Sequence, residues 1–198
     1  GCEISECELV GGETAEMPGT YEKGKFDIAG FAVGIVDKKN ILNKKKIKKN
    51  DLILAVPSNG LDAVKMLRTS VREANENGRI VVFIEPIALY MTKDLHVLKD
   101  SKWSFKYPSP KEEIPLGEFA EYGEGNKLII ISYGNGLYLS LQAKKEIEEK
   151  IKNKIKVIDL RWLSEINVPK LLDAFGDCKK ILIVDECRRN GCHGEGLM

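Results

Sequence analysis

Residues 127–198 alternate three short apolar runs with two amphipathic stretches, and this alternation constrains the fold more than any other part of the chain. Two of the runs, residues 128–131 and 181–184, lack the apolar–polar alternation of a half-buried strand. Continuous apolar runs suit strands that are buried on both faces of a parallel sheet. The pattern predicts a βαβαβ unit within a three-layer α/β/α fold that has a mainly parallel sheet.

The two amphipathic stretches predict helices that each bury one apolar face against this sheet. In the first stretch, the apolar residues recur every four positions: Leu139, Ala143, Ile147 and Ile151. In the second stretch, they recur at mixed helical spacing: Val168, Leu171, Leu172 and Phe175. Asn167 is the expected amino-terminal cap of the second helix, and Gly176 lies just past its expected end.

Residues 51–92 predict a separate βαβ unit, with strands near residues 52–56 and 80–84. The helix between them has one apolar face, formed by Ala63, Leu67, Val71 and Ala74. Residues 93–113 have no periodicity, and we interpret them as a linker on the surface. The carboxyl-terminal domain is expected to occupy residues 114–198.

Residues 1–50 predict a small β-rich segment that is too short to hold a core alone. Its expected strands, residues 7–12 and 26–36, are joined by a glycine-rich loop. This loop combines the amides of a glycine pair with the carboxylates of Glu13 and Glu16 and the hydroxyl of Thr14. Such groups suit phosphate and Mg²⁺, and an acidic loop without a ligand is the alternative.

The charge balance argues against several classes of partner. The formal net charge is +1 over 198 residues, so no overall field favours nucleic acid or an anionic membrane. Seven lysines within residues 38–49 have no interleaved arginine or aromatic residue, which favours a solvated linker. No apolar run reaches the roughly 18 residues of a membrane span, and no signal peptide opens the chain. Five cysteines without CxxC spacing predict reduced thiols in a cytoplasmic protein.

Ligands of open α/β sheets collect beyond the carboxyl ends of the strands, which here are residues 132–136, 159–161 and 185–189. The glycines in the first of these segments fall short of a GxGxxG pattern, so a tight turn is favoured over a phosphate loop. Three candidate zinc ligands follow the last strand: Cys187, Cys192 and His193. They lack a fourth ligand and the usual pair spacing, so a metal site is not favoured.

The opening residues, GCEISECELVGGETAEMPGTYEKGKFDIAGFAVGIVDK, closely resemble phosphoribosylformylglycinamidine cyclo-ligase, the aminoimidazole ribonucleotide (AIR) synthetase of purine biosynthesis. The family pattern CELVGGETAEMPG…YD(I/V)AGF.VG is matched, with Phe26 in place of the tyrosine. The resemblance implies that this segment belongs to an ATP-binding half of that enzyme. It gives nucleotide or magnesium roles to Glu13, Thr14 and Glu16, and makes ATP a candidate cofactor.

From about residue 53, the chain resembles the β subunit of thiamine-diphosphate-dependent 2-oxo acid dehydrogenases, which have a transketolase-like fold. The matching pieces are AVPSNGLDAVKMLRTSVREANENGRIVVFIEPIALY, IPLGEFAEYGEGNKLIIISYGNG, KVIDLRWLSEINV and ILIVDECRRNGCHGEG. The resemblance implies the end of a pyrimidine-binding domain in residues 53–90 and most of a transketolase carboxyl-terminal domain in residues 116–198.

In that family, the carboxyl-terminal domain mainly builds the subunit interface. The resemblance therefore implies a homo- or hetero-oligomer, with an α subunit and a lipoyl acyltransferase as candidate partners. It assigns interface or channel roles to Glu186, Arg188 and His193. The glutamate that activates the cofactor lies upstream in this family, and the diphosphate and Mg²⁺ site belongs to another domain or subunit. Thiamine diphosphate and Mg²⁺ are thus the family's cofactors, and we do not expect this chain to bind them alone.

Both ends of the chain look cut, and the two resemblances meet near residues 51–60. We interpret the chain as a chimera of two enzyme fragments, either natural or an artefact of assembly. The first expectation for function is a fragment of a 2-oxo acid dehydrogenase β subunit that serves mainly subunit association. The alternatives are an ATP-dependent cyclo-ligase and a non-catalytic association module.

Overall fold

The computed structural model describes residues 2–3, 6–14, 24, 33–40, 51–187 and 192–198. The chain divides into two compact units, Gly1–Asn43 and Lys44–Met198. Within the described residues, the second unit contains all of the β-strands and α-helices, so the candidate site is built from this unit.

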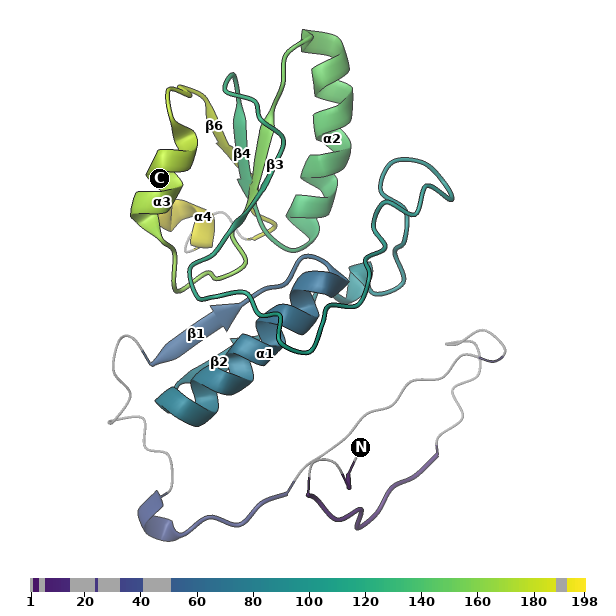
Figure 1. Ribbon diagram of the computed structural model, residues 1–198, viewed down its shortest axis with the longest axis vertical. Coiled ribbons are helices and arrows are strands. Elements are labelled where there is room, and N and C mark those ends of the chain that lie inside the picture. Colours follow the sequence, from purple (N-terminus) through teal and green to yellow (C-terminus); the bar gives the residue numbers. More distant parts are fainter. Residues whose placement is uncertain (1, 4–5, 15–23, 25–32, 41–50, 188–191) are drawn as a thin grey trace. The chain divides into compact units, whose positions relative to one another are not determined.

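A four-stranded sheet forms the centre of the second unit (Figure 1). Its strands are β3 (Ala120–Tyr122), β4 (Ile129–Ser132), β5 (Lys156–Asp159) and β6 (Ile181–Ile183), in the order β3-β5-β4-β6. Strand β4 pairs in parallel with both β5 and β6, and β3 pairs with β5 in the antiparallel direction. The structure therefore confirms the predicted mainly parallel sheet.

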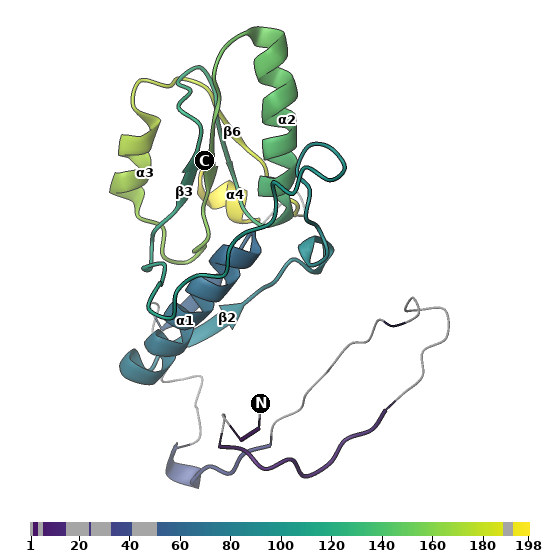
Figure 2. The ribbon, with the colours of Figure 1, turned by 45° about the vertical axis from the view of Figure 1, so that its right-hand side comes forward.

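Helices cover both faces of this sheet, as Figure 1 and Figure 2 show, which gives the predicted three layers. Alternate residues of β4 serve the two faces, because successive side chains of a strand point in opposite directions. Ile130 packs with Leu137 of α2 (Asn135–Ile151). Ile131 packs on the other side with Leu171 of α3 (Val168–Phe175). The core is thus two apolar layers on either side of β4 and β5.

The prediction that the strand over residues 181–184 is buried on both faces is wrong. All four residues of β4 are buried, as its continuous apolar run predicts. In β6, by contrast, Ile181 and Leu182 are 42% and 47% exposed. Strand β6 is the edge of the sheet, so a neighbour contacts it on one side only. An apolar run indicates burial on both faces only for a strand in the interior of a sheet.

The predicted faces of two helices need correction. On α2, Leu139 and Ile151 are exposed, whereas Leu137 and Leu141 face the sheet. Only residues 133–134 separate β4 from α2, and this short connection fixes which face of the helix meets the sheet. On α3, two residues of the predicted apolar face, Val168 and Leu172, are exposed. The caps are as predicted: Asn167 accepts from the Lys170 amide at 3.1 Å, and Gly176 ends α3 with φ +50°.

The predicted βαβ unit is confirmed and consists of β1 (Leu52–Ala55), α1 (Gly60–Asn77) and β2 (Ile80–Phe83). Strands β1 and β2 pair in parallel, with Leu52 opposite Ile80. Asn59 caps α1 by accepting from the Asp62 amide, and Gly78 ends it in the left-handed region at φ +63°.

Helix α1 buries a largely polar face, contrary to the expectation from its apolar residues. Leu67 and Val71 are 50% and 52% exposed. The buried residues of α1 are Asp62, Met66, Thr69, Ser70 and Glu73. Their polar groups have partners: the Thr69 hydroxyl, for example, donates to the Ile114 carbonyl at 2.8 Å. Specific partners for polar side chains decided the orientation of this helix, and hydrophobic periodicity does not reveal such partners.

The βαβ unit and the carboxyl-terminal sheet are joined through β1. The Val56 amide donates to the Arg161 carbonyl, and the Leu163 amide donates to the Leu54 carbonyl, both at 2.8 Å. Trp162 is fully buried in a cluster with Ile53 and other residues of the βαβ unit. Residues 51–92 and 114–198 therefore lie within one compact unit.

The segment expected to be a surface linker, residues 93–113, is partly anchored in the core. It follows a short 3-10 helix, η3 (Ile87–Leu89). Trp103 is buried and packs edge-on against Tyr138 of α2, with ring centroids 5.2 Å apart.

A short helix, α4 (His193–Gly196), follows the last strand.

The first unit does not show the predicted strand over residues 7–12. These residues have no regular structure, and Leu9 and Val10 are exposed. A strand needs a hydrogen-bonded neighbouring strand, and no strand pairing among the described residues includes this segment. The second expected strand covers residues 26–36. Residues 26–32 lie outside the described residues, and residues 33–36 are not a strand. The one regular element described in this unit is the 3-10 helix η1 (Lys38–Asn40).

Candidate functional site

Three strand ends of the second unit converge on one buried hydroxyl group. Ser58 follows β1, Gly134 follows β4, and Asp159 ends β5. The Ser58 hydroxyl donates to Asp159 Oδ1 at 2.8 Å, and its oxygen accepts from the Gly134 amide at 2.8 Å. This arrangement places polar groups at the carboxyl ends of parallel strands, where ligands of α/β sheets usually bind.

Asp159 is the most perturbed group of this network. Its side chain is fully buried, and its Oδ2 atom has no hydrogen-bond partner among the described residues. Burial raises the pKa of Asp159 to about 7, although the nearby Arg161 guanidinium opposes the change. The carboxyl group therefore titrates near neutral pH, where a small change in its surroundings alters its charge.

Arg161 and Asp62 form an ion pair beside Asp159. The Arg161 Nε and Nη2 atoms donate to the two oxygens of Asp62 at 2.8 and 2.9 Å, and both side chains are largely buried. The Asn59 amide adds a third bond to Asp62 at 3.0 Å. The backbone of Arg161 has φ +61°, a left-handed conformation that is unusual for a residue with a side chain. The ion pair and the backbone bond to Val56 hold this conformation.

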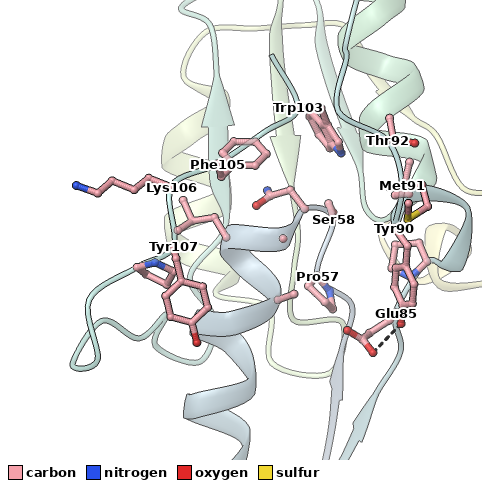
Figure 3. Close-up of a pocket in the computed structure, with 17 residues that line it drawn as sticks. Pro57, Ser58, Glu85, Tyr90, Met91, Thr92, Trp103, Phe105, Lys106 and Tyr107 are labelled. Carbon is pink, nitrogen blue, oxygen red and sulfur yellow. Dashed lines mark hydrogen bonds between the residues drawn. The ribbon is translucent and has the colours of Figure 1, made fainter. Parts of the chain in front are cut away.

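A pocket of about 540 Å³ opens next to this network (Figure 3). Ser58 and Asn59 belong both to the network and to the pocket wall. The remaining wall comes from the start of α1, from residues 85–92 and from residues 103–108. The pocket and the network thus form one site, with its polar part at the strand ends and its aromatic part outside them.

A second polar cluster lies between the ends of β4 and β6. The Tyr133 hydroxyl donates to Asp185 Oδ1 at 2.5 Å, and the Gly194 amide donates to Asp185 Oδ2 at 2.8 Å. Burial and the bond to Asp185 raise the pKa of Tyr133. His193 stacks edge-on against Tyr133, and burial lowers the pKa of its imidazole against the effect of Asp185. The His193 Nε2 atom is buried without a partner in the described part of the chain.

The structure describes four of the six residues that were predicted for nucleotide, interface or channel roles. Glu13 and Thr14 are exposed in the first unit, and Glu16 lies outside the described residues. Glu186 is exposed after β6, His193 is half-buried, and Arg188 is again outside the described residues. The interface and nucleotide roles of these six residues stay predictions. Across the described ranges, no group of three or more His, Cys, Asp or Glu side chains is placed to hold a metal ion.

The sequence patterns placed Asp159 and Arg161 at a strand end where ligands collect, but they did not single out the other two side chains of the network, Ser58 and Asp62. Two signals pointed towards the network. Asp159 and Arg161 follow an apolar run, and Ser58 stands in a turn after another apolar run. Both segments follow the carboxyl end of a strand, which is where α/β sheets usually bind ligands. The pairing between segments about 100 positions apart had no signal in the sequence.

All five cysteines lie in described parts of the chain, and none forms a disulfide bond. In the same described ranges, no helix is both long enough and apolar enough to cross a membrane.

Comparison with protein families finds a match to the family described as "Transketolase, C-terminal domain", over residues 117–198. The solved structures include a similar chain described as "Split gene transketolase, inactive beta4 tetramer". The TM-score is 0.51 at 16% sequence identity, and the similarity covers 74% of this chain and 43% of that chain. At this identity, the similarity concerns the fold.

Curated relatives point to a different enzyme. A phosphoribosylformylglycinamidine cyclo-ligase from Clostridium tetani is 40% identical over 105 residues, covering 50% of this chain and 32% of the relative. The enzyme of the same name from Prochlorococcus marinus is 49% identical over 78 residues, covering 38% of this chain and 22% of the relative. Both matches are longer than the 50 residues expected to carry this resemblance.

The chain spans a third or less of the length of these curated relatives. The strands of the sheet β3-β5-β4-β6 all lie within the residues that the family model matches. Residues 117–198 thus match the transketolase carboxyl-terminal domain in sequence, and the fold of the chain is similar to that of a transketolase chain.

Proposed function

We propose that residues 51–198 are part of the β subunit of a thiamine-diphosphate-dependent 2-oxo acid dehydrogenase and serve mainly subunit association. The match to the transketolase carboxyl-terminal domain supports this proposal, as does the transketolase-like fold of the second unit. The partners proposed are a second copy of the chain or an α subunit, together with a lipoyl acyltransferase.

The observation that carries the proposal is apolar surface on elements that would normally bury it. Leu67 and Val71 lie one turn apart on α1 and are both half-exposed. Exposed side chains of two of the edge strands add to this surface: Val82 of β2, and Ile181 and Leu182 of β6. Apolar side chains on a helix and at sheet edges are typical of surfaces that another subunit covers.

We do not expect this chain to bind thiamine diphosphate and Mg²⁺ by itself, because the family places the groups that hold them in other domains or subunits. Thiamine diphosphate is held through a bound divalent ion, and the described residues have no cluster of ligands for one. The groups at the strand ends are used in bonds within the chain: Asp62 to Arg161, and Ser58 to Asp159. We propose that this part of the enzyme supports a site that other domains complete.

Charge substitution on α1 tests the association role. Leu67→Glu together with Val71→Glu places two carboxylates on the proposed contact without disturbing a buried residue. We expect light scattering after gel filtration to show a smaller assembly for this variant than for the unmodified chain. Leu98→Glu is the matched control, because Leu98 is exposed in a loop. Equal masses for all three proteins, with unchanged circular dichroism, would reject this face of α1 as the contact.

The second proposal is an ATP-dependent cyclo-ligase segment, which the 40–49% identity to cyclo-ligases favours. The two proposals are compatible if the chain is a chimera, natural or assembled in error. Isothermal titration calorimetry with ATP and, separately, with thiamine diphosphate, both with Mg²⁺, distinguishes them. We expect no heat from either ligand with this chain alone. Heat with ATP that disappears in Glu13→Gln would favour the cyclo-ligase, and heat with thiamine diphosphate would contradict the supporting role described above.

Sequencing across the source locus tests the chimera directly. One continuous gene that encodes complete flanking domains of a single enzyme would refute it, whereas separate genes for the two matches would show an assembly error.

A further inference from the structure

The pocket beside the strand ends is lined by four aromatic rings. Trp103 and Phe105 form one corner, with ring centroids 5.7 Å apart and ring planes at 72°. In Figure 3, Phe105 and Tyr107 lie on one side of the pocket and Tyr90 on the other, with Pro57 and Ser58 between them. A ligand in this space meets aromatic rings on several sides.

The aromatic rings make the wall of this pocket electron-rich. The faces of aromatic rings are negative, and they attract cations at distances up to about 6 Å. Tyr107 already shows this behaviour, because the Arg68 guanidinium carbon lies 5.8 Å from its ring centroid. The rings of the pocket are therefore suited to a positive group more than to a negative one.

The charged side chains of the pocket wall also favour a positively charged ligand. Glu85 contributes a carboxylate, and it accepts a bond from the Tyr90 hydroxyl at 2.9 Å. Lys106 also belongs to the wall, but its amine extends away from the pocket in Figure 3. The amino-terminal end of α1 contributes a partial positive charge, and the ion pair of Asp62 with Arg161 beside it adds no net charge. One carboxylate thus faces the space without an opposing amine.

We propose that this pocket binds an organic cation, in which a quaternary ammonium or protonated amine is attached to an apolar body. The rings surround the apolar body and stabilise the charge by cation–π attraction, and Glu85 provides the counter-charge. A volume of about 540 Å³ exceeds that of a bare ammonium group, so the apolar body is needed to fill it. This role does not depend on the proposed subunit association.

Isothermal titration calorimetry of the full chain with benzyltrimethylammonium tests the proposal. Benzenesulfonate, a ring of similar size with a negative charge, and benzyl alcohol, a neutral ring, are the comparison ligands. We expect saturable binding of the cation and binding at least about fivefold weaker for the other two. Absence of saturable cation binding, or equal or tighter binding of the neutral or anionic ring, would overturn the proposal.

Two substitutions locate the binding. Glu85→Gln removes the counter-charge, and Phe105→Leu removes a ring while keeping apolar bulk. Each is expected to weaken cation binding by about five- to tenfold. Glu76→Gln, an exposed change on α1 outside the pocket, is the control and should leave the affinity unchanged. Unchanged affinity in both pocket variants, with circular dichroism like that of the unmodified chain, would place the cation elsewhere and refute the assignment.

Discussion

Replacing Asp159 by Asn is expected to stabilise the protein at neutral and alkaline pH. The folded chain raises the pKa of this carboxyl group from 3.8 to about 7, mainly because burial penalises its ionised form. A pKa difference of this size corresponds to about 4 kcal/mol in the free energy of unfolding. Asn keeps an oxygen that accepts from the Ser58 hydroxyl and carries no charge, so the variant avoids this penalty.

The sign of the effect follows from proton binding. Between pH 4 and 7 the folded protein holds a proton on Asp159 that the unfolded chain has released, so this group lowers the stability as pH rises. The stability of Asp159→Asn minus that of the unmodified chain should therefore be near zero at about pH 4 and approach about 4 kcal/mol near pH 8. His193 contributes equally to both proteins, and its effect cancels in this difference.

Urea denaturation of both proteins across this pH range measures the difference. Asp173→Asn, an exposed change on α3, provides the control and should show little dependence on pH. A difference that stays constant with pH would refute the perturbed titration. If Asp159→Asn were less stable than the unmodified chain at pH 8, the ionised carboxylate of Asp159 would be stabilising in its buried position.

Other substitutions test separate parts of the structure, all by urea denaturation. Arg161→Ala leaves the Asp62 carboxylate buried without its ion pair, and should cost about 3–5 kcal/mol; a loss below about 1 kcal/mol would show that the pair is not needed. Leu137→Ala removes a fully buried side chain between α2 and the sheet and should cost about 2–5 kcal/mol, whereas Leu139→Ala on the exposed face should cost less than about 1 kcal/mol. Gly134→Ala introduces a side chain at φ +55° and should cost about 1–3 kcal/mol; no loss would indicate that this turn relaxes.

Strands β1, β2, β4, β5 and β6 could be predicted because their apolar runs are local signals, whereas β3 has no such run. The runs at residues 128–131 and 156–159 became adjacent parallel strands, and the capping role of Asn167 was visible in the sequence. The exposed faces of the helices could not be predicted in the same way. Leu67 has the spacing of a core residue, yet the polar partners of Asp62 and Thr69 turned the opposite face of α1 inward.

Local patterns placed Gly134, Asp159 and Arg161 at strand ends where ligands collect, but they did not indicate the rest of the candidate site. Asp159 looks in the sequence like an ordinary acidic residue at a strand end. Its burial arises because Ser58 and Gly134 approach it from segments that are far apart in the chain. The aromatic pocket has the same origin, since Tyr90 and Phe105 lie in or beside a segment that the sequence suggested was a simple surface linker.

Sedimentation equilibrium of the full chain tests the central proposal, which is that the transketolase-like unit serves association. The chain has a mass of 22.1 kDa. We predict a measured mass that is a whole-number multiple of this value and that falls towards it on dilution. A mass of a single chain at every concentration would contradict an association role that this chain performs with copies of itself.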